Sequence, residues 1–323
     1  MLKFLTLPIL FFILGTSTAE ATPLGTIPTI QENNLQLTFD FRSDLWTSPM
    51  SYKDSPVRIM LADLRSPLFK TETWSASAAI YSESLNLGRA DFQLGQKQIF
   101  IGNSLRHELG GIGVRKNFSD GASASAYAAY VTASDVPWGT PRNDYFYGSV
   151  NYRTALVDNH QWIFAIDQNN NRGIYNGTPF PYFGVIYNKE SKWLVAAGFP
   201  FVHFMYKTEK EWEHDFRLTP FGINYSAVKP VDANAVFTFK TAVTVRSYLY
   251  DQRTEDDARL YYQEVMIEGG VKRYVSADTA VTFALGGAID RRLYESERVY
   301  RPSSALQVID NDYYGRLGVE FRL

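Results

Sequence analysis

The chain contains four histidines, the side chains best suited to act as general bases near neutral pH: His107, His160, His203 and His214. Hydrolysis of an ester or an amide would require one of them to lie beside an oxygen nucleophile that it can activate. The segment Glu213-His214-Asp215 places two carboxylates next to a histidine. In an extended chain, however, Glu213 and Asp215 point away from His214, whose face is shared by Trp212 and Phe216. A loop or interfacial histidine is the simpler interpretation, and the sequence predicts no catalytic residue and no enzyme.

Residues that could bind a metal ion or a phosphate form no specific pattern either. The chain has no cysteine, which excludes thiolate metal sites, cysteine nucleophiles and disulfides. The acidic run Glu255-Asp256-Asp257 lacks the alternating ligands and central glycine of a calcium loop, so we interpret it as a solvated loop. Gly110-Gly111-Ile112-Gly113 is not followed by a helical pattern, which favours a strand bend over a phosphate loop. The sequence therefore predicts no cofactor and no metal.

Charged residues that alternate with apolar ones are more informative. In the segment 237–248, Phe239 and Val245 lie on one face of a predicted strand, whereas Lys240 and Arg246 lie on the other. Three further segments repeat this alternation. The side chains that we predict to share the polar face, as candidates for the lining of an interior, are Asp40, Arg42, Lys240, Arg246, Tyr248, Glu264, Glu268, Lys272, Arg316, Glu320 and Arg322.

The last eleven residues, Tyr313–Leu323, have the clearest strand pattern. Every second residue is apolar or glycine and the residues between are more polar, so the apolar period is two. Such a strand needs a partner for its edge, and Leu35–Arg42, the first strand of the pattern, is the natural one. The segment Arg316–Leu323 resembles the C-terminal signal of bacterial outer-membrane barrels: a polar residue, a glycine two positions later, and hydrophobic residues third from last and last. Leu323 stands where phenylalanine or tryptophan is commoner.

The N-terminus carries the pattern of an export signal. Lys3 is followed by a mostly apolar run, Phe4–Leu14, and Ala19-Glu20-Ala21 has the small residues that a signal peptidase requires. We predict cleavage after Ala21. The apolar run is shorter than the roughly 20 apolar residues that span a bilayer, so we interpret it as a removed signal and not as a membrane anchor. The predicted organisation is a signal peptide at 1–21, a periplasmic leader at 22–34 and one barrel domain at 35–323.

Composition supports a barrel as well. The mean hydropathy is -0.22, and aromatic residues make up 15% of the chain. Strands that show lipid only at every second residue hide their hydrophobicity from an average, and aromatic girdles mark both membrane interfaces. Short and long connections alternate, with a long one at Leu293–Asp312, as expected for periplasmic turns and extracellular loops. The predicted fold is therefore all-β, a closed antiparallel transmembrane β-barrel.

Three segments decide the number of strands. The apolar residues of Val57–Leu64 fit either a helix or a strand, and both interpretations stay open. Asp91–Ile101 and Phe216–Ala227 are each predicted to be one strand. The chain offers 14 or 15 candidates, and since single-chain bacterial barrels have an even number, we predict about 12 to 14 strands. The region 183–206 is also similar to a pattern in poorly characterised outer-membrane barrel families, which implies no defined activity.

The resemblance to outer-membrane barrels implies a location in the bacterial outer membrane. It also implies contact with outer-membrane lipid and lipopolysaccharide, and recognition of the C-terminal strand by the barrel-assembly machinery. A net charge of -2 gives no support for nucleic-acid binding. Charges on the inner face must meet water or one another. We therefore expect a passive, porin-like channel for small hydrophilic solutes. The alternatives are a structural or surface-interaction barrel with a filled lumen and, third, a barrel lipase or protease.

Overall fold

The computed structural model describes residues 34–45, 56–89, 91–94, 97–102, 104–189, 192–220, 222–299 and 306–323. The predicted signal peptide at 1–21 lies outside these residues, as does the predicted leader at 22–34 apart from Asn34. Every regular element in the described part of the chain is a β-strand. Within that part, no helix is long and apolar enough to cross a membrane.

The described residues form 19 strands, numbered in chain order. The first ten are β1 (Gln36–Asp44), β2 (Arg58–Lys70), β3 (Trp74–Asn86), β4 (Asp91–Leu94), β5 (Lys97–Phe100), β6 (Leu105–Asn117), β7 (Ser123–Ser134), β8 (Asp144–Arg153), β9 (His160–Asn169) and β10 (Phe180–Lys189). The others are β11 (Trp193–Phe199), β12 (Phe201–Lys207), β13 (Glu213–Thr219), β14 (Gly222–Asp232), β15 (Ala235–Tyr248), β16 (Arg259–Tyr274), β17 (Thr279–Ser296), β18 (Leu306–Ile309) and β19 (Asp312–Arg322).

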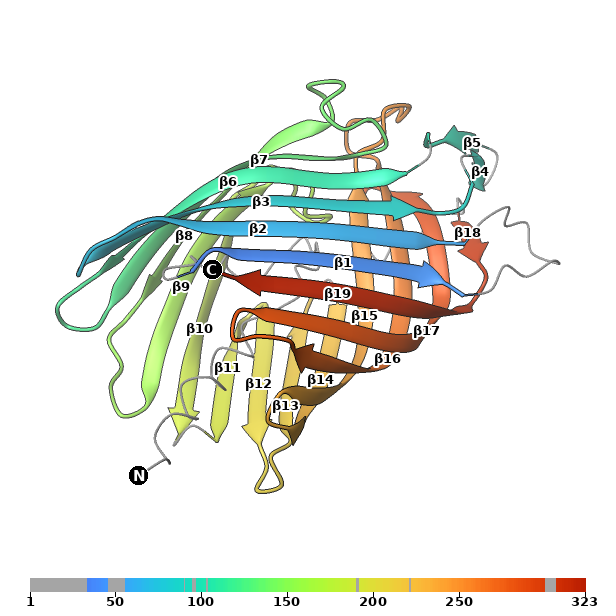
Figure 1. Cartoon of the computed structure of the whole chain (residues 1–323). Coiled ribbons are helices and arrows are strands. Elements are labelled where there is room, and N and C mark those ends of the chain that lie inside the picture. The colour runs from blue at the N-terminus through green and yellow to red at the C-terminus, as the bar shows by residue number, and fades with distance from the viewer. Residues whose placement is uncertain are drawn as a thin grey trace.

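Sixteen of these strands form one closed antiparallel barrel (Figure 1). Each pairs with the next along the chain, except that β3 pairs with β6, past the separate hairpin β4–β5, and β17 pairs with β19. The short strand β18 pairs with the end of β17, beyond the β17–β19 ladder. β19 pairs with β1, in a register that sets Gln36 opposite Arg322 and Phe41 opposite Leu317, and this closes the ring. The predicted fold class and the predicted pairing of the last strand with the first are confirmed.

The barrel has 16 strands where the sequence predicts about 12 to 14, so the predicted count is wrong. Phe216–Ala227 is not one strand, because β13 ends at Thr219 and β14 begins at Gly222. Val57–Leu64 belongs to a strand, β2, apart from its first residue. Asp91–Ile101 folds back on itself as the hairpin β4–β5 and does not join the wall. The tight turn between β13 and β14 does not interrupt the apolar pattern, so two strands resemble one in the sequence.

The two rims of the barrel differ. One carries only short turns, such as residues 71–73 and 275–278, whereas the other carries the longest connections, such as residues 87–104, 170–179 and 249–258, together with the tight β11–β12 and β13–β14 turns. In bacterial barrels the short turns are periplasmic and the long loops extracellular. In Figure 1 the hairpin β4–β5 lies at the extracellular end, near β18.

The outer face of the barrel is apolar. Ile80, Ile112 and Val150 are 60, 59 and 61% exposed, although a water-soluble protein would bury such side chains. Exposed tryptophans, including Trp74 and Trp193, lie where strands leave the periplasmic rim, the position of an interfacial girdle. The barrel therefore spans a lipid bilayer. Closed antiparallel barrels built in this way belong to the bacterial outer membrane, and that is where this chain resides.

Candidate functional site in the barrel interior

The eleven residues with a predicted place on the polar face lie on the inner face of the barrel. Two contacts between strands that are not neighbours establish this: Arg42 on β1 reaches Glu264 on β16, and Arg246 on β15 reaches Glu83 on β3. Alternate positions of the same strands share the face. The structure places Asp40 and Arg42 on β1, Lys240, Arg246 and Tyr248 on β15, Glu264, Glu268 and Lys272 on β16, and Arg316, Glu320 and Arg322 on β19.

Glu264 is the centre of a network of buried charges, and its own side chain is completely buried. Arg42 donates two hydrogen bonds to it, from Nη1 to Oε1 at 2.7 Å and from Nη2 to Oε2 at 2.8 Å. Arg246 Nη1 donates to Oε1 at 3.3 Å, and the Tyr262 hydroxyl donates to Oε2 at 2.9 Å. Arg246 also donates from Nε to Glu83 Oε1 at 3.1 Å. Side chains of four strands, β1, β3, β15 and β16, are thus joined across the interior, and the pairing offsets much of the cost of burying each charge.

A second group of ion pairs lies closer to the periplasmic rim. Arg316 donates from Nε to Asp40 Oδ2 at 2.8 Å and from Nη1 to Glu268 Oε1 at 2.7 Å. Lys272 Nζ donates to both carboxylate oxygens of Glu320 at 2.8 Å. These pairs join β1, β16 and β19, so the structure brings most of the predicted interior charges into contact with an opposite charge.

The remaining predicted residues are Tyr248, Arg322 and Lys240. Tyr248 donates its hydroxyl to Glu83 Oε1 at 3.4 Å, at the edge of the central network. Arg322 Nη2 lies 3.6 Å from Glu320 Oε2. Lys240 is half-buried on the inner face of β15.

Sequence reasoning misses four members of the interior: Asp44, Glu83, Tyr262 and Arg291. Arg291 is completely buried and donates from Nη1 to both oxygens of Asp44, at 3.0 and 2.9 Å. Asp44 and Glu83 continue the strand alternation two positions past Arg42 and Tyr81, so extending the predicted strands would find them. Arg291 follows an irregularity in the β16–β17 register, where Asp290 has a φ of 50°, and this irregularity changes which residues face inward.

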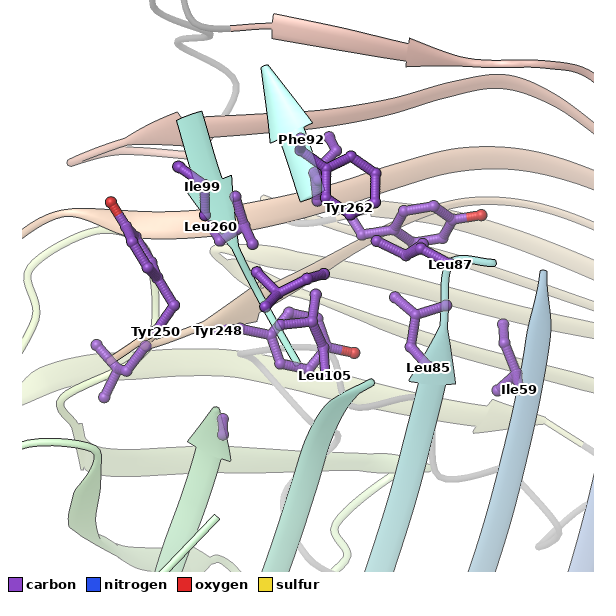
Figure 2. Close-up of a cluster of buried hydrophobic side chains, with 14 of the residues drawn as sticks. Ile59, Leu85, Leu87, Phe92, Ile99, Leu105, Tyr248, Tyr250, Leu260 and Tyr262 are labelled. Carbon is purple, nitrogen blue, oxygen red and sulfur yellow. The ribbon is translucent and has the colours of Figure 1, made fainter. Parts of the chain in front are cut away.

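An apolar layer covers the central network on its extracellular side (Figure 2). Three parts of the chain contribute to it: the ends of wall strands, the hairpin β4–β5, and the β15–β16 connection with the strand ends beside it. In Figure 2 side chains from all three parts converge on one cluster. Its buried members include Ile59, Leu85, Leu105 and Val131 from the wall, Phe92, Leu94, Ile99 and Ile101 from the hairpin region, and Tyr248, Leu249, Tyr250 and Leu260 from the connection.

The β15–β16 connection crosses the interior to reach this layer. We call residues 247–260 the tip. Its Leu249 N–H donates to the carbonyl of Ala133 on β7 at 2.6 Å, and the N–H of Asp251 donates to Asp135 Oδ1 at 2.9 Å. β7 and β15 are far apart in the order of strands around the barrel. The tip therefore closes the extracellular end from within.

Polar contacts hold the tip at its outer side. Arg253, 4% exposed, donates to the side chain of Asn143 and, at 3.0 Å, to the carbonyl of Tyr250. The hydroxyl of Tyr250 donates to Glu295. Burial and this neighbouring carboxylate raise the pKa of Tyr250 well above its usual value. The hydroxyl consequently keeps its proton, and the hydrogen bond, over the physiological pH range.

The interior is partly exposed beside β12 and β13. His203 Nε2 lies 3.3 Å from Asp215 Oδ2, and Asp215 also accepts hydrogen bonds from Arg217 at 2.9 and 2.8 Å. The side chains of His203 and Arg217 are 26 and 25% exposed, so water reaches this part of the lumen. His214 faces outward instead, where Nδ1 is 2.8 Å from the Tyr225 hydroxyl. Across the described ranges, no three acidic or histidine residues are arranged to hold a metal ion.

The arrangement as a whole obstructs passage through the extracellular half of the barrel. Ion pairs neutralise the charges of the inner face, and the apolar layer beyond them excludes water. Partly exposed polar groups remain beside β12 and β13.

Comparison with known proteins identifies no family. No protein-family model matches the sequence, and no curated protein matches it significantly. Among solved structures, an outer-membrane channel from Pseudomonas putida F1 is similar over 91% of this chain and 97% of that one, with 8% identity and a TM-score of 0.38. The deltaS2 mutant of the TodX monoaromatic hydrocarbon channel matches over 94% of each chain, with 11% identity and a TM-score of 0.43. The translocator domain of the autotransporter NalP from Neisseria meningitidis is similar over 98% of this chain and 97% of that domain, with 10% identity and a TM-score of 0.30. Similarity at this level gives no information about a ligand.

Proposed function

We propose that the chain is a passive outer-membrane channel for small hydrophilic solutes, and that its extracellular end is closed in the conformation described. One observation carries the proposal: a barrel of 16 strands is obstructed by a tip of its own chain. Barrels of roughly 16 to 18 strands enclose a water-filled channel when nothing occupies them. Movement of the tip would open the lumen while the strand pairing below it stays intact.

The polarity of the lumen supports a hydrophilic solute. His203 and Arg217 are partly exposed inside the barrel, and the interior charges have both signs. A lumen of mixed sign favours neither anions nor cations strongly, in contrast to pores lined with rings of one charge. The solute class that this lining fits is small, polar and without a large net charge.

The pairing of the interior charges favours a second candidate, a structural or surface-interaction barrel with a permanently filled lumen. In that case Arg42, Arg246 and Glu264 would serve stability alone, and the tip would never leave the interior. The extracellular connections would then provide the function, by contact with another molecule.

Uptake of solutes into vesicles distinguishes the two candidates. In the test variant, Asn-Gly replaces residues 248–260 and joins Ser247 to Tyr261, which already face each other in the β15–β16 ladder. Asn-Gly suits a two-residue hairpin turn. For a channel closed by the tip, vesicles with this variant should admit a monosaccharide at least about fivefold faster than vesicles with the unaltered chain. Equal rates, for a variant whose barrel is intact by its mobility in unheated gels, would favour the filled barrel.

We also propose that the chain has no catalytic activity. His203 shares Asp215 with Arg217, and His214 faces the membrane side of the wall beside Tyr225, so neither is directed at a serine nucleophile. Esterase and protease assays of the folded chain should show no turnover above that of empty vesicles. Turnover that disappears on His203→Ala or His214→Ala would contradict the proposal.

A further inference from the structure

The barrel wall is lowest at β11, β12 and β13, which have seven residues each. By comparison, β15, β16 and β17 have 14, 16 and 18 residues. A strand needs about 9 to 11 residues to cross the hydrocarbon of a bilayer. At the extracellular rim Pro200 alone separates β11 from β12, and β13 and β14 meet within residues 219–222. Hydrocarbon of ordinary thickness therefore extends above this part of the rim.

On either side of this low rim, β10 and β15 extend beyond the residues that pair with β11 and β14. The β10–β11 ladder begins with Phe183 opposite Phe199, so the segment Phe180–Tyr182 continues beyond the turn. The β14–β15 ladder likewise ends with Thr244 opposite Gly222, while β15 continues for four more residues. Strand pairing does not join β10 to β15 at this height.

The β9–β10 loop, residues 170–179, closes the wall between β10 and β15. Asn171 Nδ2 donates to the carbonyl of Ser247 at 2.8 Å, and Ser247 Oγ donates to Asn171 Oδ1 at 2.7 Å. Ile174 packs on the cluster that contains Val245, Tyr261 and Tyr294. Alternation predicts that Val245 faces lipid, and the structure corrects this: Val245 is 1% exposed, because it belongs to the cluster against which the loop packs.

The loop pairs many of its backbone polar groups internally. Arg172 is completely buried and donates to the carbonyls of Tyr175 at 3.0 Å, Thr178 at 3.2 Å and Asp167 at 3.1 Å. Its guanidinium also pairs with the Asp167 carboxylate at 2.8 Å. Irregular backbone at membrane depth is tolerated only when its polar groups are satisfied within the protein. The backbone N–H groups of Asn171, Gly173, Gly177 and Thr178 all bond to acceptors within 169–176.

An aromatic strip continues from the lipid-facing wall onto the loop. Phe183, on the outer face of β10, is 53% exposed, and its ring centroid lies 6.0 Å from that of Phe199. Behind them the buried ring of Phe180 lies 5.7 Å from that of Phe199, and Tyr175 stacks on Phe180 at 5.6 Å. Tyr175 is 67% exposed. The outward surface of the loop is thus an extension of the apolar belt.

We propose that the β9–β10 loop is part of the membrane-spanning wall, and that acyl chains of the outer leaflet cover it. Its composition, with Asn169, Asn170 and Asn171 followed by Arg172, would otherwise indicate a loop in water. The low rim, the paired backbone and the aromatic strip each favour hydrocarbon instead. The partner of this surface is the lipid tail, whereas the acidic run of the β15–β16 connection, in which the Asp256 side chain is 85% exposed, remains in water. The proposal is independent of whether the lumen conducts.

Single cysteines carrying a nitroxide test the proposal, since the chain has no cysteine of its own. Tyr175→Cys and Thr178→Cys probe the loop, Phe183→Cys marks the lipid-facing wall, and Thr254→Cys, next to the acidic run of the β15–β16 connection, marks a loop in water. All four side chains are exposed, so labelling should leave the barrel intact. In phosphatidylcholine–phosphatidylglycerol vesicles, the ratio of collisions with oxygen to collisions with a nickel chelate is then measured by electron paramagnetic resonance.

The ratio at Tyr175→Cys should be close to that at Phe183→Cys and at least about threefold above that at Thr254→Cys, because oxygen concentrates in hydrocarbon and the chelate in water. A ratio at Tyr175→Cys equal to that at Thr254→Cys overturns the proposal. Quenching of a fluorophore on the same cysteines by lipids brominated on the acyl chain provides a second measurement. Quenching at Phe183→Cys without quenching at Tyr175→Cys or Thr178→Cys would overturn it as well.

Discussion

Replacing Glu264 with alanine should lower the free energy of unfolding by about 3–5 kcal/mol, the range found when one partner of a buried ion pair is removed. The Glu264 side chain is completely buried and accepts hydrogen bonds from Arg42, Arg246 and Tyr262. Without it, the guanidinium of Arg42 stays in the interior and loses both of these hydrogen bonds. Urea unfolding of the reconstituted barrel, followed by tryptophan fluorescence, measures the change.

Asp256→Ala is the matched control for Glu264→Ala. Asp256 also accepts a hydrogen bond from an arginine, Arg142, at 2.7 Å, but its side chain is 85% exposed. Removing an exposed ion pair should change stability by less than about 1 kcal/mol. If Glu264→Ala cost no more than Asp256→Ala, the central network would not hold the interior together as described.

Replacing Arg291 with alanine should have a comparable effect, again a loss of about 3–5 kcal/mol. Arg291 binds both oxygens of Asp44 on β1 and donates from Nε to the carbonyl of Asp310 at 2.7 Å, so it joins β17 to β1 and to the connection before β19. The substitution would leave the Asp44 carboxylate buried without this guanidinium. The same urea titration reports the loss.

The neighbouring residue provides the control. Arg292 pairs with Asp290 at 2.6 Å, but the two side chains are 39 and 46% exposed. Arg292→Ala should therefore change stability by less than about 1 kcal/mol. Equal losses for Arg291→Ala and Arg292→Ala would show that burial of the ion pair is not the source of the effect.

The sequence is sufficient to predict the fold class, because alternation of period two is a local property of each strand. It is strong in Tyr313–Leu323, whose pairing with the first strand follows from the need to cover an apolar edge. The same alternation suffices to place Arg246 and Glu264 on one face of their strands. Which acidic or basic side chain meets which depends on strand register and on distance across the barrel, and neither is encoded locally.

Local sequence patterns do not predict three other features of the structure. The turn between Thr219 and Gly222 is too short to interrupt the apolar pattern, so two strands resemble one. The irregularity before Arg291 reverses the alternation within a single strand. The tip resembles an ordinary extracellular loop, and contacts across the barrel, such as the hydrogen bond from Leu249 to Ala133, reveal that it lies inside.

The central claim, that the tip closes a barrel otherwise wide enough to conduct, is tested most directly by ion conductance across planar bilayers. The unaltered chain and the variant with Asn-Gly in place of residues 248–260 would be compared at the same voltage and salt concentration. We expect small or absent current steps for the unaltered chain, and steps at least about fivefold larger for the variant, because 16 strands enclose an aqueous lumen once the tip is removed. Large, steady steps from the unaltered chain, or no increase in a variant that retains its barrel, would contradict the account.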